Sequence, residues 1–327
     1  MKPIRIGLIG CGGISRAHAR GYQNLPGLFQ VTATCDTVES NAAERGEYLG
    51  AKRIYTDYEK MLKEADIDAV DICLPHDLHA DVSIAASEAG KHVIVEKPIA
   101  ITIPEADSMI AAARKAGAIL MVALNERYDP VHERIKHMID EGKLGQLLCI
   151  RIDHNQNVRL PEGHWIRSRS RLGGGVLIGS GIHRVDLLRW FGGEVVKVSN
   201  FQVEQPERME GEVAVVMSVL FESGCIGEVT AIWAVRKAPW YEGVWVYGTE
   251  GSVYRINGLF WDGPDGYVKL DVPEADSFTE ELRHFGQCIL KGDNPLTNGE
   301  EARRSLEVVL AAYRSAGTGN IMKIQRE

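Results

Sequence analysis

The sequence predicts an α/β protein with two domains: a doubly wound parallel sheet with helices on both faces, then an α+β domain with a largely antiparallel sheet. Three observations support this. The 327 residues exceed what one hydrophobic core usually serves, and about 150 residues per domain gives two domains. Short apolar runs alternate with helical patterns as far as residue 124, and beyond it longer strand-like segments are separated by turns. We therefore place the domains at 1–124 and 125–327.

The first domain consists of short β-branched runs joined by amphipathic helices. The runs cover residues 4–10, 29–36, 69–75, 92–97 and 119–124. Apolar residues recur at spacings of three and four in 14–24, 41–49, 78–88 and 104–116, which is typical of helices. Runs that are apolar throughout indicate parallel strands buried on both faces. Gly90 and Gly117 follow two of these helices, where a left-handed cap is expected.

The second domain begins with a helix over 130–141 and then changes to strands. The strand-like segments are 146–157, 195–203, 213–221, 225–235 and 244–247, and turn residues separate several of them. This pattern predicts an antiparallel or mixed sheet with an embedded helix over 175–191 on one face. Two amphipathic helices, 278–290 and 299–316, and a short strand over 321–325 close the sequence.

Charge and composition exclude several classes of protein. With 37 basic and 45 acidic side chains the net charge is −8, and no basic cluster stands out, so we expect no nucleic-acid partner. No apolar stretch reaches the roughly 18 residues of a membrane span, and the run after Met1 is too short for a signal peptide. Six cysteines without a C-x-x-C pair favour reduced thiols in the cytoplasm over disulfides or a metal site.

A glycine-rich turn joins the first run to the first helix. Residues 10–15 read Gly-Cys-Gly-Gly-Ile-Ser, which matches G-x-G-x-x-(G/A) with Ser15 at the third glycine position. Such a turn brings backbone N–H groups and the positive end of a helix to a pyrophosphate. Asp36 ends the next run, where a carboxylate binds the ribose 2′-hydroxyl and repels a 2′-phosphate, so the sequence favours NAD over NADP. The predicted contacts of this turn are Gly10, Gly12, Gly13 and Ile14.

Lys97 ends the run 92–97 within the triplet Glu96-Lys97-Pro98. The carboxyl ends of parallel strands form the edge at which open α/β sheets bind ligands. The proline stops the strand and so holds the lysine at that edge. From position alone, an ordinary exposed lysine is an equally good interpretation.

His183 follows three consecutive glycines, 173–175, and an apolar helical stretch. The glycines let the backbone approach another group closely, and Asp186 lies one helical turn after the histidine. A single histidine on a helix is more often structural than catalytic. Only its combination with Lys97 favours a catalytic role.

Together these segments resemble the Gfo/Idh/MocA family of glucose–fructose oxidoreductase and inositol dehydrogenase relatives. The resemblance rests on 7–15, Asp36, Leu74-Pro75 with His79, the Glu-Lys-Pro triplet and 173–186, and it covers essentially the whole chain. It implies an N-terminal Rossmann domain and a C-terminal domain whose open sheet often mediates oligomers, here a dimer or tetramer. It also implies NAD(P)-dependent oxidation or reduction of a sugar, inositol or related polyol. The further coenzyme contacts that it implies are Leu74, Pro75, His79, Glu96, Lys97 and Asn125.

The resemblance implies a hydride-transfer mechanism in which Lys97 and His183 are catalytic and touch the substrate. A secondary hydroxyl releases hydride readily only as it loses its proton, and a histidine, whose pKa lies near working pH, suits the task of a base. Lys97 would hydrogen-bond the same oxygen and favour its developing negative charge. No metal is required.

The sequence departs from the family at Gly179, four residues before the histidine, where many members carry an aspartate. His183 therefore lacks the neighbour expected to orient its ring. Asp186 lies on the same helix face and is one substitute. Relatives with both residues carry an aspartate there as well, which indicates that Asp186 has another role.

Polar and aromatic residues beyond the first domain predict a substrate site. Asn125 and Tyr128 lie in a segment similar to one that enters the cleft in the family, with packing at the domain junction as the alternative. The loop 155–171 offers amide, imidazole and aromatic groups for a hydroxyl-rich ligand. Trp240 and Tyr241 are another predicted wall of the site, with core packing as their alternative. The predicted substrate contacts of the loop are Asn155, Asn157, Trp165 and Arg167.

The same loop carries four arginines, which in an acidic protein could hold a carboxylate or phosphate. They are Arg159, Arg167, Arg169 and Arg171. Because guanidinium groups bind such anions bidentately, we hypothesise that the substrate is an acidic sugar derivative. A solvated or subunit-facing basic loop is the alternative.

Two other functions stay open at this point. The missing aspartate fits a non-catalytic sensor of dinucleotide or sugar with the same fold. An enzyme with tightly held NAD could instead oxidise and re-reduce its substrate internally, with hydrolysis or epimerisation as the net reaction. Tight NAD binding without turnover would favour the sensor, and co-purified NAD that dilution does not remove would favour internal redox chemistry.

Overall fold

The computed structural model describes residues 2–237 and 242–324, and the chain divides into two compact units. The first unit comprises Met1–Tyr128 and Ala275–Arg303, and the second comprises Asp129–Glu274 and Arg304–Glu327. This division differs from the predicted boundary after residue 124, because a later segment returns to the first unit. Trp240 and Tyr241, the predicted wall of the substrate site, lie outside the described residues.

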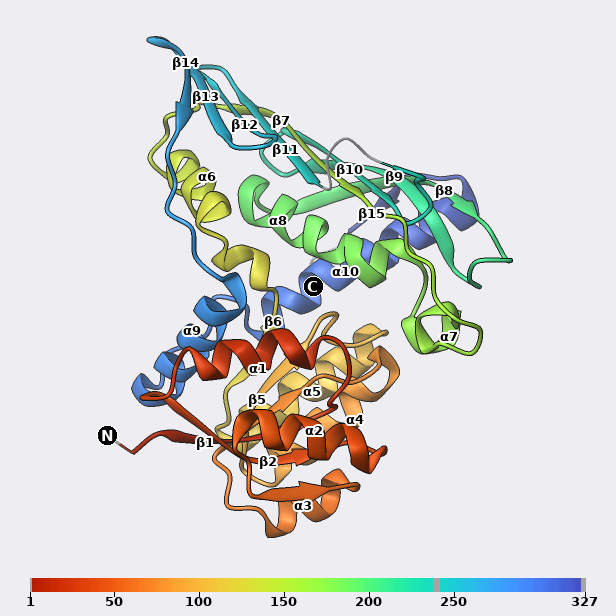
Figure 1. Cartoon of the computed structure of the whole chain (residues 1–327). Helices are drawn as coiled ribbons and strands as arrows, with labels where there is room; N and C mark the ends of the chain where they lie inside the picture. The colour runs from red at the N-terminus through yellow and green to blue at the C-terminus, as the bar shows by residue number, and fades with distance from the viewer. Residues whose placement is uncertain (1, 238–241, 325–327) are drawn as a thin grey trace. The chain divides into compact units, whose positions relative to one another are not determined.

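The sheet of the first unit has six parallel strands in the order β3-β2-β1-β4-β5-β6 (Figure 1). This is the strand order of a doubly wound, dinucleotide-binding sheet, as predicted. Because strands β1, β4, β5 and β6 lack exposed residues, their sequences are apolar runs rather than alternating patterns. The strands are β1 (Ile4–Ile9), β2 (Phe29–Cys35), β3 (Arg53–Tyr55), β4 (Ala69–Ile72), β5 (His92–Glu96) and β6 (Leu120–Ala123).

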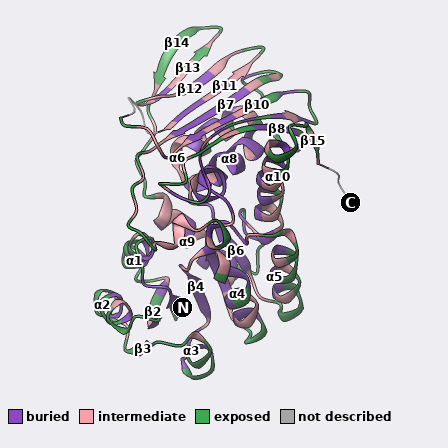
Figure 2. Cartoon of the chain, turned by 90° about the vertical axis from the view of Figure 1, so that its right-hand side faces the viewer, coloured by how far each residue is buried: buried purple, intermediate pink, exposed green. Residues whose placement is uncertain are grey.

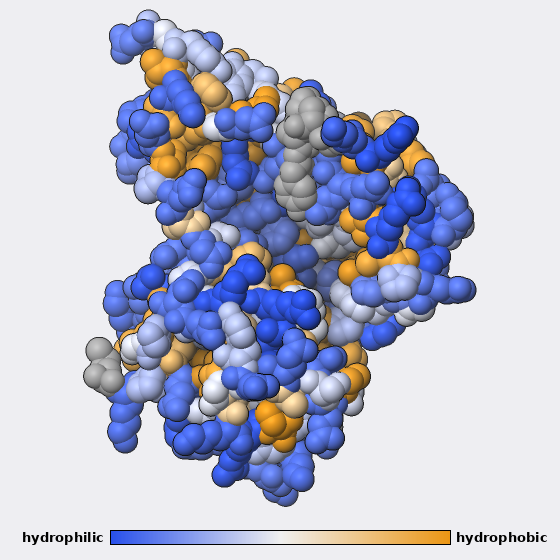
Figure 3. All heavy atoms as spheres, viewed as in Figure 1, coloured by the Kyte–Doolittle hydropathy of each residue, from blue (hydrophilic) through white to orange (hydrophobic). Residues whose placement is uncertain are grey.

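Helices lie on both faces of this sheet, and their ends follow local sequence signals. Gly90 and Gly117 have left-handed φ values of 71° and 64°, which confirms the predicted caps. Thr102 and Glu105 form a reciprocal capping box at the start of α5. On the face of the unit that Figure 3 shows, hydrophilic side chains dominate and apolar ones appear in small patches. The helices are α1 (Ser15–Gln23), α2 (Glu39–Leu49), α3 (Tyr58–Glu64), α4 (His79–Glu88) and α5 (Ile103–Ala116).

Helix α9 (Ser277–Lys291) explains why the chain returns to the first unit. Its buried residues Leu282 and Phe285 belong to the same core cluster as Tyr22 and Phe29. The side chain of Asn24 also donates a hydrogen bond to Thr279 Oγ1, at 3.0 Å. The helix therefore buries its apolar face against α1 and the sheet of the first unit.

The second unit is built on a nine-stranded sheet in the order β14-β13-β12-β11-β7-β10-β9-β8-β15. Among the described strand pairs of this sheet, only β7 and β10 are parallel, so the sheet is largely antiparallel, as predicted. The strands are β7 (Leu147–Asn155), β8 (Val195–Glu204), β9 (Glu212–Phe221), β10 (Ile226–Ile232), β11 (Glu242–Gly248), β12 (Ser252–Arg255), β13 (Leu259–Gly263), β14 (Gly266–Leu270) and β15 (Met322–Lys323).

Helices cover one face of this sheet. Helix α8 (Ile182–Gly192) packs on β7 and β10, and α6 (Pro130–Asp140) packs on α8 (Figure 1). Figure 2 shows α8 buried, while exposed residues interrupt the strands. Helix α10 (Gly299–Thr318) passes from the segment of the first unit into the second. In the described part of the chain, no helix combines the length and the apolarity needed to cross a membrane.

Candidate active site

The turn after β1 can form only with glycine at its first position. Gly10 has a φ of +89°, and its N–H donates to the Cys35 carbonyl at 2.8 Å. A Cβ at Gly10 would lie 2.3 Å from the carbonyl oxygen of Cys73. Both the backbone conformation and the close approach of β4 therefore exclude a side chain here.

The next two glycines leave room for a ligand at the start of α1. Gly12 and Gly13 are exposed, and a Cβ on either would meet no atom within 4 Å. Ser15 Oγ donates to the Gly12 carbonyl at 2.7 Å, and Ile14, the N-cap residue of α1, makes no side-chain cap. The backbone N–H groups of the first turn are thus open to a pyrophosphate, which fits the predicted contacts Gly10, Gly12, Gly13 and Ile14.

Asp36 follows β2 and lies against this turn. Its Oδ2 accepts from the Cys11 N–H and its Oδ1 from the Val38 N–H, both at 2.8 Å. Asn41 Nδ2 also contacts Oδ1 at 3.5 Å. These bonds fix the carboxylate beside the glycine turn and leave Oδ2 a further lone pair. The arrangement fits a ribose diol at this edge of the sheet.

The loop after β4 is held by His79 at the start of α4. The ring of His79 is buried, with Nδ1 2.8 Å from the Pro98 carbonyl and Nε2 2.9 Å from the Leu74 carbonyl. Burial lowers the pKa of His79, although both carbonyls oppose this shift. His79 therefore joins the Leu74-Pro75 loop to the segment after Lys97, while contact of these residues with the coenzyme stays a prediction.

Lys97 lies directly after β5, at the carboxyl edge of the sheet, and is half-buried. Its backbone N–H donates to Oε2 of Glu96 at 3.1 Å, and the Lys97–Pro98 peptide bond is cis. Burial would raise the pKa of Glu96, but the hydrogen bond from His18 and the charges of His18 and Lys97 lower it. Glu96 is therefore an ionised carboxylate beside Lys97.

Sequence reasoning named Glu96 but missed the two polar residues that lie with it near Lys97, His18 and Asp71. His18 on α1 contacts both Asp71 on β4 and Glu96 on β5, and all three side chains are buried. The only sequence signal is that Asp71 and Glu96 interrupt otherwise apolar strands. Nothing local indicates that a histidine 53 residues earlier lies between them.

Asn125 and Tyr128 lie in the short helical turn Asn125–Tyr128 after β6. Asn125 donates to Ser277 Oγ at 2.8 Å. Tyr128 is 5% exposed and belongs to the core cluster of the first unit, with its hydroxyl 3.3 Å from Thr297 Oγ1. The position of Tyr128 supports the packing alternative, and its contact with a substrate stays a prediction.

In the second unit, His183 stands immediately after an irregular helical turn. The predicted helix over 175–191 begins with a π-helical turn, Leu177–Gly181, and continues as α8. Such π turns are frequent at functional sites. Tyr313 accepts from the N–H groups of Gly175 and Ile178, and its hydroxyl donates to Glu212 at 3.0 Å. Buried polar side chains thus fix the start of the segment that carries His183, which is half-buried.

Trp233 occupies the space beside Gly179, the position at which the family resemblance implies an aspartate. A Cβ at Gly179 would lie 2.3 Å from the ring carbon Cη2 of Trp233. Trp233 is 6% exposed and follows β10. Its backbone N–H donates to the Val213 carbonyl. The indole therefore leaves no room for a side chain at position 179 unless the ring moves.

This packing gives a testable expectation for Gly179→Ala. The added methyl group would force the buried indole to move, so we expect a loss of about 1–3 kcal/mol in the free energy of unfolding. Gly317→Ala is the matched control, because a Cβ at Gly317 on α10 meets no atom within 4 Å. Urea unfolding of both variants checks this, and equal stability of the two would contradict the packing described.

Asp186 is buried, and its side chain contacts helix α10. Its Oδ1 accepts from Ser305 Oγ on α10 at 2.9 Å. The same serine accepts from Arg189 Nη1 at 3.0 Å. Asp186 therefore ties α8 to α10, which supports the interpretation that it has another role.

The loop 155–171 forms a polar pocket at one end of the second unit. Asn155 ends β7 and is half-buried, whereas Asn157 is exposed and contacts the Arg236 carbonyl at 3.5 Å. Trp165 is half-buried and stacks on His164. A pocket of about 200 Å³ is lined by Val158, Arg159, Leu160, Arg167, Glu207 and Arg208. Arg169 instead pairs with Glu204 at 2.5 Å.

Lys97 and the coenzyme turn belong to the first unit, and His183, Gly179 and the basic loop belong to the second. The sheet of the first unit brings the glycine turn, Asp36, the loop after β4 and Lys97 to one edge. In that sheet only β4 lies between β1 and β5. This edge offers the features of a dinucleotide site together with an ammonium group.

Comparisons with known proteins identify the family and the fold of the chain. Residues 4–124 match the model of an oxidoreductase family with an NAD-binding Rossmann fold, and residues 132–254 match the GFO/IDH/MocA C-terminal domain. The 1,5-anhydro-D-fructose reductase of Ensifer adhaerens is 30% identical over 98% of this chain and 98% of its own. The myo-inositol 2-dehydrogenase of Thermotoga maritima is 27% identical over 98% of this chain and 99% of its own. The crystal structure of aldose-aldose oxidoreductase from Caulobacter crescentus complexed with glycerol has a TM-score of 0.89 at 25% identity, covering 98% of this chain and 100% of that one.

The two family matches span the segments that carried the resemblance in the sequence. The first contains the glycine turn and Lys97, and the second contains Gly179 and His183. The likeness to the Ensifer reductase extends over nearly the full length of both chains. The chain belongs to the GFO/IDH/MocA family of NAD-binding oxidoreductases.

Proposed function

We propose that this oxidoreductase transfers hydride between NAD and a secondary hydroxyl of a sugar, inositol or related polyol. The observation that carries the proposal is the position of Lys97 at the carboxyl end of β5, on the same sheet edge as the glycine turn and Asp36. The curated relatives named 1,5-anhydro-D-fructose reductase and myo-inositol 2-dehydrogenase support the substrate class.

The proposed mechanism assigns separate tasks to two side chains. The glycine turn and Asp36 would hold the coenzyme, which when bound would supply the hydride acceptor for oxidation and the hydride donor for reduction. The ammonium of Lys97 donates a hydrogen bond to the reacting oxygen and stabilises the negative charge that develops on it. The imidazole of His183 takes the hydroxyl proton during oxidation and returns it during reduction. The remaining proposed coenzyme contacts are Leu74, Pro75, His79, Glu96 and Asn125.

A panel of sugars, cyclitols and linear polyols tests the proposal with NAD reduction as readout. Turnover of at least one polyol is the expected result. A parallel titration measures NAD binding. Tight NAD binding without turnover of any substrate would contradict the proposal and favour the sensor.

Selectivity for NAD over NADP should depend on the charge of Asp36. We expect Asp36→Asn to lower the ratio of kcat/KM for NAD to that for NADP by about 10-fold or more, because juxtaposed like charges are strongly unfavourable. Asparagine can still accept the Cys11 N–H bond, so the turn is retained. Asp57→Ala, which removes the N-cap of α3, is the control and should leave the ratio unchanged. A constant ratio in Asp36→Asn would remove this carboxylate from coenzyme selection.

We further propose that the substrate carries an acidic group. The pocket that Arg159, Arg167 and Arg208 line supports this, because guanidinium groups bind carboxylate and phosphate bidentately. Asn155, Asn157 and Trp165 would contact its hydroxyl groups and ring. Comparing uronates with neutral polyols tests the idea, and turnover of neutral polyols alone would dismiss it.

We also propose a homo-oligomer, a dimer or tetramer, formed through the outer face of the nine-stranded sheet. Phe201 on β8 is 78% exposed and pairs with Val216 on β9, and Ile226 on β10 is 54% exposed. Exposed apolar side chains on an open sheet favour contact with a second copy. Sedimentation analysis checks this, and a monomer at all concentrations would contradict it. The six unpaired cysteines support the proposal of a cytoplasmic location.

A further inference from the structure

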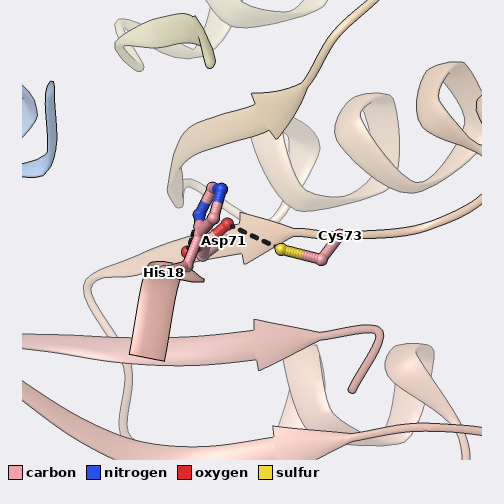
Figure 4. A group of neighbouring side chains, drawn as sticks. All are labelled: His18, Asp71 and Cys73. Carbon is pink, nitrogen blue, oxygen red and sulfur yellow. Dashed lines mark hydrogen bonds and ion pairs between the residues drawn. The ribbon is translucent and has the colours of Figure 1, made fainter. Parts of the chain in front are cut away.

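A buried polar cluster connects the coenzyme-binding helix to the strand that ends at Lys97. His18 on α1 lies with Nδ1 2.8 Å from Asp71 Oδ2 on β4 and with Nε2 3.0 Å from Glu96 Oε1 on β5. His18 and Asp71 are fully buried, and Glu96 is 5% exposed. Figure 4 shows the ring of His18 directed at Asp71, with the thiol of Cys73 on the other side of that carboxylate.

The geometry determines the charge of His18. A neutral imidazole has one N–H and one bare nitrogen, and a bare nitrogen facing a buried carboxylate would be repulsive. Both ring nitrogens face carboxyl groups, and the lowered pKa of Glu96 disfavours an acid form that would donate to the ring. We therefore infer that both nitrogens carry a proton and that His18 is an imidazolium. Burial would lower the pKa of His18, but the charge of Asp71 and its hydrogen bond raise it well above its usual value.

Asp71 and Glu96 differ in how much support they have. Asp71 also accepts from the Tyr22 hydroxyl at 2.9 Å and from the Cys73 thiol at 3.5 Å. Glu96 accepts from His18 through Oε1 and from the Lys97 N–H through Oε2. Without His18, Asp71 would keep its hydrogen bonds from two other side chains. Glu96 would keep only the bond from the backbone N–H of Lys97 among the described hydrogen bonds.

Glu281 on α9 completes the surroundings of the cluster. It is fully buried, and neither of its carboxyl oxygens has a hydrogen-bond partner among the described residues. Burial and the neighbouring charges of Glu96 and Asp71 raise the pKa of Glu281 well above its usual value, which favours its neutral form. The charge of Lys97 acts on the same cluster, because it lowers the pKa of Glu96.

A metal ion is the other occupant that these side chains could hold. Ligand atoms of His18, Asp71 and Cys73 lie within 4.8 Å of one another. However, both ring nitrogens of His18 already face carboxylates, and burial raises the pKa of the Cys73 thiol, whereas a metal needs the thiolate. Hydrogen bonds therefore account for the arrangement.

We propose that His18 is a positioning residue for Lys97: its imidazolium keeps Glu96 ionised and in place, and Glu96 holds Lys97 at the end of β5 as an ammonium. The proposal rests on the proposed role of Lys97 as hydrogen-bond donor to the substrate. If His18 loses its charge, the buried Glu96 takes up a proton and no longer serves as the counter-charge of Lys97. Lys97 then loses its proton at a lower pH and is less firmly oriented. Because His18 lies on α1, the same bonds tie the coenzyme-binding helix to the lysine.

The experiment compares His18→Gln and Glu96→Gln with His92→Gln as the matched control. His92 begins β5 and accepts the Ile119 N–H through Nδ1 at 3.0 Å, outside the cluster. The titration of the Lys97 ammonium is followed by NMR in full-length protein with selectively labelled lysine, and Lys97→Met assigns its signal. We expect its pKa to fall by about one unit or more in both variants and to stay constant in His92→Gln.

Kinetics provide the second readout. We expect kcat for carbonyl reduction to fall by between about 10-fold and about 10²-fold at neutral pH, with its decline at high pH moved to lower pH. The KM for NADH should stay within about twofold of its value in the unmodified enzyme, because the substituted residues act through Lys97 in the chemical step. An unchanged Lys97 titration together with an unchanged pH profile would overturn the proposal.

A measurement on the unmodified protein keeps the test decisive if the variants fail to fold. Nitrogen NMR should show both ring nitrogens of His18 protonated at pH 8. A neutral ring there, or one equivalent of bound zinc that is lost in His18→Gln, would overturn the proposal. The kinetic role of Lys97 is judged separately: full activity of Lys97→Met contradicts the proposed function, whereas an inactive Lys97→Met with a normal His18→Gln contradicts only the inference about His18.

Discussion

Replacing Lys97 by methionine is expected to lower kcat by about 10²-fold or more, because the site loses the donor that stabilises charge on the reacting oxygen. Affinity for NAD should change little, since the glycine turn and Asp36 are retained. Methionine keeps the length of the side chain and tolerates partial burial, which limits structural damage. Steady-state kinetics with the best polyol of the panel, together with an NAD titration, measures both quantities.

Lys91→Met is the matched control for this prediction. Lys91 lies immediately before β5, at the opposite end of the strand, and its Nζ donates to the Ile67 carbonyl at 2.9 Å. Its replacement should leave kcat unchanged. Similar kcat values for the two variants would remove Lys97 from the mechanism.

Replacing His183 by asparagine is expected to lower kcat for oxidation by about 10²-fold to 10⁴-fold, the range of a general base. The unmodified enzyme should lose activity as the pH falls, because a protonated imidazole cannot accept the hydroxyl proton. In His183→Asn this decline at low pH should disappear, since asparagine does not titrate. The pH profile of kcat/KM for the polyol measures the effect.

His137→Asn is the control for the histidine, because His137 lies on α6 and pairs with Glu141 at 2.8 Å on the surface. It should reproduce the unmodified profile. A decline at low pH that persists in His183→Asn would assign the titration to another group and refute the role of His183 as base.

The parallel sheet of the first unit was predictable because its signal is local. Four of its strands lack exposed residues, so each is a continuous apolar run between helical patterns. Strand β3 and helix α3 were missed: β3 has three residues with two of them exposed, and α3 has seven. The strands β12, β13 and β14 were missed for the same reason, since each has only four or five residues, few of them buried.

The division of the chain was not predictable from the sequence. The amphipathic pattern of α9 shows that one face is buried, but it does not show the partner. The helix packs on Tyr22 and Phe29, which lie more than 240 residues earlier. The local sequence of a helix does not identify a packing partner that is distant along the chain.

The candidate site shows the same contrast. The glycine turn and Asp36 were found because the coenzyme fold imposes a fixed spacing along the chain. The bonds of His18 with Asp71 and Glu96, and the contact of Trp233 with Gly179, join residues from separate strands and helices. They depend on the tertiary structure and could not be read from spacing.

The central claim is that Lys97 and His183 act on the same oxygen beside the nicotinamide. A crystal structure of the complex with NADH and the best polyol of the panel tests it most directly. We predict that Nζ of Lys97 and a ring nitrogen of His183 both lie within about 3.2 Å of one hydroxyl oxygen, whose carbon faces the nicotinamide ring. A polyol that contacts only one of the two side chains, or a His183 ring directed away from the nicotinamide, would contradict the account.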